Sequence, residues 1–194
     1  MAEPTNKKAS EKRKNTVFSR RGMRLESMID DANEYYLTHD IANIHKKPTP
    51  ITIVDVDYKS RSTARITDAY FVKPSTTDYN GVYKGFYLDF DAKQTTNANN
   101  FPLSNVKQHQ IDHLTSVLKN GGIGFMIIEF SKYDEDFILP ASNLLDFWRE
   151  SLKEDGAKSI KYQWFVDNTS QINSKILPIF DYLSAVGSLL ENGR

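Results

Sequence analysis

The segment from Phe86 to Lys93, FYLDFDAK, alternates apolar and polar side chains over its whole length. Successive side chains of a β-strand point to opposite faces, so this alternation predicts a strand with one apolar and one polar face. The apolar face would comprise Phe86, Leu88, Phe90 and Ala92, and the polar face Tyr87, Asp89, Asp91 and Lys93. A row of charges of this kind is either a solvated strand face or a metal site.

The length of 194 residues suits one domain with a tail. Residues 1–17 are small, polar and basic, which predicts a disordered tail, and residues 18–190 are expected to form a single domain. The chain has no cysteine, which excludes disulfides, thiolate catalysis and cysteine-bound zinc. Because no apolar stretch is long enough to span a bilayer or to act as a secretion signal, we expect a cytoplasmic protein without a membrane partner.

Basic side chains are concentrated in the first half of the chain. Residues 1–24 contain eight Lys or Arg against two Glu. This excess predicts a polyanionic partner such as nucleic acid, because basic groups release counterions from phosphates. The alternative is that these lysines only keep a flexible tail soluble. The basic bias continues at Lys46, Lys47, Lys59, Arg61, Arg65, Lys73 and Lys84.

The remaining elements follow from hydrophobic period and turn residues. We expect helices over residues 22–38, 104–120 with Ser104 as N-cap, 142–152 with Ser142 as N-cap, and within 179–190. Strands are expected over 51–58, 64–72, 86–93, 123–130 and 137–141, with residues 75–85 read as a turn and 59–63 as a basic turn. This order predicts an α/β fold with a mixed sheet.

Two acids and a lysine suggest the chemistry. Asp78 lies 13 residues before Asp91, a gap that allows a turn to bring the two carboxylates together. Two close carboxylates repel each other unless a cation lies between them, and Mg²⁺ prefers such oxygen ligands. Lys93, on the same strand face, could orient or help deprotonate a metal-bound water and balance charge in the transition state. The set predicts phosphodiester hydrolysis; the alternative is a chance Asp-x-Lys on an exposed strand.

An amide interrupts the apolar stripe of the helix expected after this strand. Val106, Gln110, Leu114 and Val117 recur at helical spacing, so Gln110 should point inward. A buried amide needs partners, and a metal-bound water, a scissile phosphate or Lys93 would each serve. The alternative is an ordinary core amide satisfied by its neighbours.

Two further polar features receive a weaker interpretation. Asp89 shares the face of Asp91 but lies about 7 Å away along the strand, so we expect it to be solvated or to support the site from outside. His109 and His113 have the spacing of a zinc pair without a third ligand nearby, so we expect them at the surface or facing DNA.

Six segments together resemble the RecU family of Holliday-junction resolvases of low-GC Gram-positive bacteria: SRRGMRLE, IANIHKKPTPI, STTDYNGVYKG, YLDFDAK, NFPL and HQIDHL. The resemblance covers roughly residues 19–148. It implies a restriction-endonuclease-like core, with a mixed β-sheet flanked by helices and a protruding basic stalk near residues 58–75. It also implies a homodimer that nicks branched DNA, namely four-way junctions, in recombination and DNA repair, with Mg²⁺ as cofactor and Mn²⁺ as a substitute.

The resemblance also assigns residues. The metal-binding positions of the family fall on Thr76, Asp78, Asp91 and Gln110, and its catalytic lysine falls on Lys93. Glu26 matches an acid near the active site. The basic bias makes Arg20, Arg21, Lys46 and Lys47 the expected DNA-binding positions, and the resemblance adds Lys59, Arg61 and Arg65 on the stalk. Asp91 stands where the family usually has Glu. A second hypothesis remains open, a branched-DNA-binding module without strong activity that modulates a recombinase of the RecA type.

Overall fold

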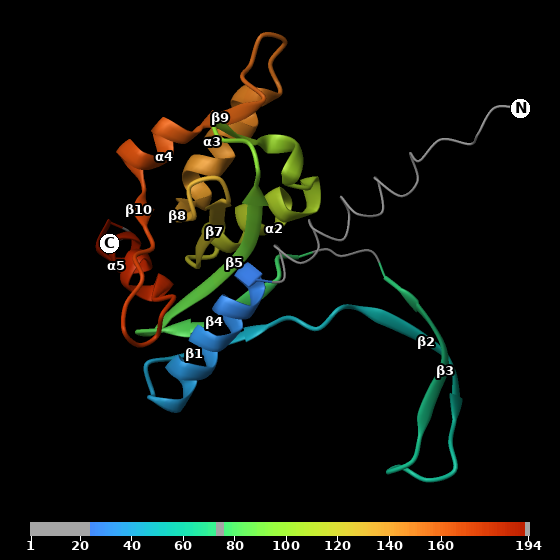
Figure 1. Ribbon diagram of the computed structural model, residues 1–194. Coiled ribbons are helices and arrows are strands. Elements are labelled where there is room, and N and C mark those ends of the chain that lie inside the picture. Colours follow the sequence, from blue (N-terminus) through green and yellow to red (C-terminus); the bar gives the residue numbers. More distant parts are fainter. Residues whose placement is uncertain (1–23, 73–75, 193–194) are drawn as a thin grey trace, which may run out of the picture.

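The computed structural model describes residues 24–72 and 76–192 (Figure 1). The tail expected over residues 1–17, and the candidate DNA-binding residues Arg20 and Arg21, lie outside this part of the chain. Within it, no helix is both long and apolar enough to cross a lipid bilayer.

A mixed six-stranded sheet forms the centre of the fold, as the sequence predicts. Its strand order is β1-β4-β5-β7-β8-β10. The strands are β1 (Ala42–Lys46), β4 (Tyr79–Tyr83), β5 (Phe86–Thr95), β7 (Ile123–Phe130), β8 (Glu135–Pro140) and β10 (Ser170–Gln171). Strands β5 and β7 are parallel, and every other neighbouring pair is antiparallel. The helix between β5 and β7 supplies the crossover that a parallel pair requires.

Helices cover both faces of the sheet (Figure 1). The N-terminal helix (residues 24–38) and α5 (Tyr182–Asn192) pack on one face, where their apolar side chains meet Leu88 and Phe90 of β5. On the other face lie α2 (Gln108–Lys119), α3 (Ala141–Ser151) and α4 (Tyr162–Asn168), which pack on Met126 and Ile128 of β7. Helix α2 lies over the polar face of β5, so Asp89 and Asp91 on this face are buried.

Strand β4 corrects the prediction that residues 75–85 are a turn. Only Lys84 and Gly85 form the turn between β4 and β5, and both have positive φ angles, as a two-residue hairpin turn requires. The edge strand β1 was also not predicted. At Gly81 of β4, an added Cβ would lie 2.1 Å from the backbone oxygen of Asn43 in β1, so only glycine allows these strands to pair this closely.

A hairpin of β2 (Ile51–Asp57) and β3 (Arg65–Phe71) extends away from the core and forms a separate two-stranded sheet (Figure 1). Nearly all of its side chains are exposed. The two strands agree with those predicted, and the protruding element matches the stalk that the family resemblance implies. Its basic residues Lys59, Arg61 and Arg65 lie at the turn and the start of β3, and Asp55, Asp57 and Asp68 on the strands equal them in number. Both strands belong to it, so the stalk begins at Ile51 rather than near residue 58.

Two predicted helix starts are wrong. Residues Leu103–Asn105 form a separate 3₁₀ turn, and α2 begins only at Gln108, so Ser104 is not its N-cap. Helix α3 begins directly after Pro140, so Ser142 lies inside its first turn. Neither helix is capped by the predicted serine; at the start of α2, the Gln110 side chain instead accepts a hydrogen bond from the backbone N–H of Lys107. The weakly patterned C-terminal region contains β9 (Ser159–Lys161), which pairs with β6 (Asn100–Pro102).

Candidate active site

The register of the β4–β5 hairpin brings the two candidate metal ligands together. Tyr79 pairs with Phe90, and extending this antiparallel register by one residue sets Asp78 opposite Asp91. The two acids thus meet across neighbouring strands rather than through a loop. Asp78 is exposed, whereas Asp91 is fully buried beneath α2.

Asp91 receives a hydrogen bond on each carboxylate oxygen. The Lys93 ammonium donates to Oδ1, and the Gln110 amide nitrogen donates to Oδ2 from the buried face of α2. Burial raises the pKa of Asp91 to about 6; the positive charge of Lys93 opposes this increase, and the negative charge of Asp78 adds to it. Asp91 is thus a buried carboxylate under the influence of a second carboxylate.

The donor atoms at this point fit Mg²⁺. Bound between Asp78 and Asp91, a divalent cation would offset both the burial of Asp91 and the repulsion between the two acids. The oxygen ligands are hard, and Thr76 precedes Asp78 closely in the chain. In residues 24–72 and 76–192, no group of three or more His, Cys, Asp or Glu side chains is arranged to hold a metal. Two carboxylates completed by water are nevertheless an ordinary Mg²⁺ site.

The amide of Gln110 points inward, as the helical stripe predicts. Its Nε2 faces Asp91, and its Oε1 accepts a hydrogen bond of 3.0 Å from the backbone N–H of Lys107 at the start of α2. To bind a metal through its oxygen, the amide would have to rotate and lose both bonds. In this arrangement Gln110 orients Asp91, and the metal-ligand role remains a prediction.

Glu26 lies near this site on the N-terminal helix. Its carboxylate forms an ion pair of 2.7 Å with Lys46 at the end of β1. The bond with Glu26 raises the pKa of Lys46, and Asp78 contributes to the same shift through its charge. The charges of Glu26 and Asp78 therefore both act on Lys46, so Glu26 lies near the site, as the family resemblance implies.

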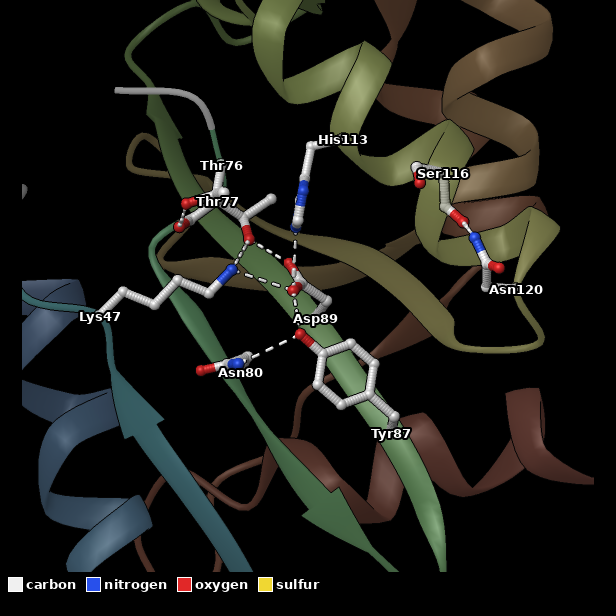
Figure 2. Close-up of polar contacts among 9 residues, drawn as sticks. All are labelled: Lys47, Thr76, Thr77, Asn80, Tyr87, Asp89, His113, Ser116 and Asn120. Carbon is white, nitrogen blue, oxygen red and sulfur yellow. Dashed lines mark hydrogen bonds and ion pairs between the residues drawn. The ribbon is translucent and has the colours of Figure 1, made fainter. Parts of the chain in front are cut away.

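Asp89 is not solvated, which corrects one of the two interpretations given to it. Its side chain is fully buried and accepts hydrogen bonds from Thr77, Lys47, Tyr87 and His113 (Figure 2). Burial would raise the pKa of Asp89, but these hydrogen bonds, led by those of Thr77 and His113, hold it below its ordinary value. Asp89 is therefore an ionised buried carboxylate.

His113 and Lys47 accordingly have partners inside the protein. His113 Nε2 lies 3.0 Å from Asp89, so the expectation that this histidine is only a surface or DNA-facing residue is wrong. Lys47 Nζ lies 2.9 Å from Asp89. Sequence reasoning gave Thr77 no role and placed Tyr87 on the polar strand face without a role. The only signal for Tyr87 was its place two residues from Asp89 on the same strand face.

The other candidate DNA-binding residues lie on the hairpin. Lys59 and Arg61 lie in the turn that joins β2 to β3, and Arg65 begins β3; all three are exposed. Closer to the acids, a groove of about 490 Å³ starts at Lys93. It is lined by Lys93, Gln94, Thr95, Thr96, Asn97, Pro102 and Asn105. Apart from Pro102, its lining side chains are uncharged and polar beside one lysine, and such groups can contact a sugar-phosphate backbone.

The described residues form an α/β fold whose mixed sheet is flanked by helices and carries Asp-x-Lys on the strand beneath α2, in agreement with the restriction-endonuclease-like core that the family resemblance implies. The sequence pattern of the family described as "RecU: Recombination protein U" matches residues 20–188. The chain therefore belongs to the RecU family, which confirms the resemblance found in its motifs.

Curated relatives are similar over nearly their full length. The protein named "Holliday junction resolvase RecU" of Leuconostoc mesenteroides is 52% identical over 178 residues, which cover 92% of this chain and 86% of the relative. The protein of the same name from Oenococcus oeni is 53% identical, with 92% and 90% covered. That of Bacillus cereus is 47% identical over 176 residues, with 91% and 88% covered.

Proposed function

We propose that this chain is a Mg²⁺-dependent endonuclease that resolves Holliday junctions by paired, symmetric nicks during recombination and DNA repair in the cytoplasm. The observation that carries the proposal is the buried carboxylate of Asp91, which lies opposite Asp78 and is held by Lys93 and Gln110. Similarity to relatives named Holliday junction resolvase supports four-way DNA junctions as the substrate.

The proposed division of roles follows from exposure and contacts. Asp78, Asp91 and Thr76 would hold the metal, with Mn²⁺ able to replace Mg²⁺. When bound, the cation polarises the scissile phosphate and makes a nearby water a better nucleophile. Gln110 orients Asp91 through its Nε2–H, so the carboxylate keeps one position beneath α2.

Lys93 contributes a positive charge at the opening of the site. Its side chain is 21% exposed, so the ammonium can contact Asp91 and still face a phosphate in the adjoining groove. Negative charge grows on the phosphate oxygens as the attacking water adds, and an ammonium placed there stabilises that charge. Lys93 can also exchange a proton with the attacking water.

Cutting both sides of a junction requires two copies of this site. A four-way junction presents two equivalent strands, so symmetric nicks follow if two chains are related by a two-fold axis, as in a homodimer. The exposed hairpin with Lys59, Arg61 and Arg65 would contact phosphates near the crossover, which selects the branched shape rather than a base sequence.

The test uses purified full-length protein and a synthetic mobile four-way junction, with each strand end-labelled in turn. With Mg²⁺ we expect nicks at symmetric positions on two opposite strands, and little cutting of a linear duplex of the same sequence. Absence of nicks with Mg²⁺ and Mn²⁺, despite salt-sensitive junction binding, would instead support the DNA-binding module that modulates a recombinase.

A further inference from the structure

Four side chains surround the buried carboxylate of Asp89 within hydrogen-bond distance. Oδ1 accepts from the Thr77 hydroxyl, while Oδ2 accepts from Lys47 at 2.9 Å and Tyr87 at 2.7 Å and lies 3.0 Å from His113 (Figure 2). These donors come from four different places: the segment after β1, the segment before β4, strand β5 itself and helix α2. One buried charge therefore links four of the segments that surround the candidate metal ligands.

Lys47 connects this charge to the backbone of Asp78. Its Nζ donates to Asp89 and to the Thr77 hydroxyl, each at 2.9 Å, and its backbone N–H donates to the carbonyl oxygen of Asp78 at 2.7 Å. Thr77, the residue directly before Asp78, is itself bonded to Asp89. The backbone at Asp78 is thus held by one direct bond and through the side chain of its neighbour.

Asp78 depends on this support because its own side chain is exposed. Among residues 24–72 and 76–192, no side chain donates a hydrogen bond to the Asp78 carboxylate. The position of its Cα relative to Asp91, from which the side chain must reach the cation, is therefore set by the backbone of residues 77 and 78. A shift of this backbone by a fraction of an ångström would displace one of the two carboxylates expected to share the cation.

We propose that Asp89, Lys47 and Thr77 form a positioning cluster that fixes Asp78 relative to Asp91, and that Lys47 serves this cluster rather than a DNA phosphate. This inference rests on the proposed function, in which Asp78 and Asp91 hold the same Mg²⁺. None of the three residues touches the reacting atoms; they act through the backbone of Asp78.

The alternative role of Lys47, contact with DNA, is disfavoured by its surroundings. Its side chain is 18% exposed, and its charge is paired with the fully buried carboxylate of Asp89. A lysine that has already been neutralised inside the protein releases few counterions when DNA binds. Lys59 and Arg61, exposed on the hairpin turn, are free of this constraint.

The experiment compares three substitutions in the full-length protein. Thr77→Val keeps the shape of a buried side chain but removes the hydroxyl, and Thr77→Ser restores it. Tyr87→Phe is the matched control, because it removes a donor to the same carboxylate through a residue that bonds neither Thr77, nor Lys47, nor the backbone of Asp78; its other partner is the side chain of Asn80. Mn²⁺ binding is measured by calorimetry without DNA, junction nicking is measured over a Mg²⁺ series, and Tm is recorded for each protein.

We expect Thr77→Val to raise the Mn²⁺ dissociation constant and the half-saturating Mg²⁺ concentration by about tenfold or more, in the range typical for residues that orient metal ligands. Thr77→Ser and Tyr87→Phe should stay within about twofold to threefold of the wild type. Excess Mg²⁺ should restore much of the nicking by Thr77→Val. The inference would be overturned if folded Thr77→Val had the same Mn²⁺ dissociation constant and half-saturating Mg²⁺ concentration as the wild type. It would also be overturned if Tyr87→Phe raised these two quantities as much as Thr77→Val does.

Lys47→Gln is a fourth variant, which tests the cluster through a different residue. It keeps an N–H donor but removes the charge, and we expect the same increase in metal requirement while junction binding in Ca²⁺ stays within about twofold of the wild type. If Thr77→Val does not fold, Lys47→Gln tests the positioning cluster by the same two measurements, Mn²⁺ binding and nicking over the Mg²⁺ series. Loss of junction binding by about tenfold, with unchanged metal binding, would return Lys47 to the DNA interface and refute the cluster.

The proposed nuclease function and the proposed positioning cluster can be refuted independently. If the wild type binds Mn²⁺ but nicks no junction, the proposed function falls, while the calorimetry on Thr77→Val still tests the cluster. If the wild type nicks and Thr77→Val has wild-type metal binding, only the positioning role falls.

Discussion

Lowering the pH should weaken metal binding through Asp91, because the metal can bind only the ionised carboxylate. Burial, with the charge of Asp78 acting in the same direction, raises the pKa of Asp91 to about 6 despite the nearby Lys93. Below that value Asp91 takes up a proton, and the proton must leave before the metal enters. Near pH 8 almost all molecules carry the carboxylate, whereas near pH 5 only about one in ten does, so the apparent dissociation constant should rise about tenfold, or about 1.4 kcal/mol.

Calorimetric titration with Mn²⁺ at several pH values measures this effect without relying on catalysis. Repeating the titration in two buffers with different ionisation enthalpies also counts the protons released, which should approach about one per metal near pH 5 and fall toward zero near pH 8. Circular dichroism at each pH confirms that the protein stays folded. An affinity that is unchanged between these pH values, with no proton release, would refute a carboxylate of raised pKa as the ligand.

Three further predictions concern the site and its scaffold. Asp78→Ala should bind junctions as the wild type does, because its side chain is exposed, but should not nick them; full cutting in Mg²⁺ would remove Asp78 from the site. Asp136 is buried, and burial together with the charge of Glu129 raises its pKa to about 7. Asp136 therefore contributes stability that is fully present at low pH and is lost as pH rises toward about 7, by up to about 4 kcal/mol. In urea unfolding, the difference in stability between the wild type and Asp136→Asn should show this decline. Gly81→Ala would place a Cβ 2.1 Å from the Asn43 carbonyl oxygen, so we expect a loss of about 2 kcal/mol or more and a lower Tm; an unchanged Tm would contradict the close strand pairing.

Local periodicity predicted the elements that carry the site. The alternation of β5, the buried strand β7 and the helical stripe that turns Gln110 inward are all confirmed. The hairpin that forms the stalk was also predictable, because its two strands and basic turn have clear local signals. The family motifs then added the residue assignments, which periodicity alone could not supply.

Several contacts could not be predicted from the sequence. Strand β4 was hidden because its residues read as a turn, and its pairing with both β1 and β5 stabilises it more than its own propensity does. For Asp89 the sequence left a solvated and a supporting role open, because strand alternation tells which face a side chain occupies, but not what covers that face. Lys47 looked available to DNA because its partner lies 42 residues further along the chain.

The sequence by itself thus determined the strand that presents Asp91 and Lys93, the helix that presents Gln110 and the family to which the chain belongs, because these depend on short-range period and on ordered motifs. Only the tertiary structure decided that Asp78 stands opposite Asp91 and that Asp89, Lys47 and Thr77 meet beneath α2. The physical reason is that burial and ion pairing depend on which distant segments pack together, and the net charge or polarity of a residue does not encode its partner.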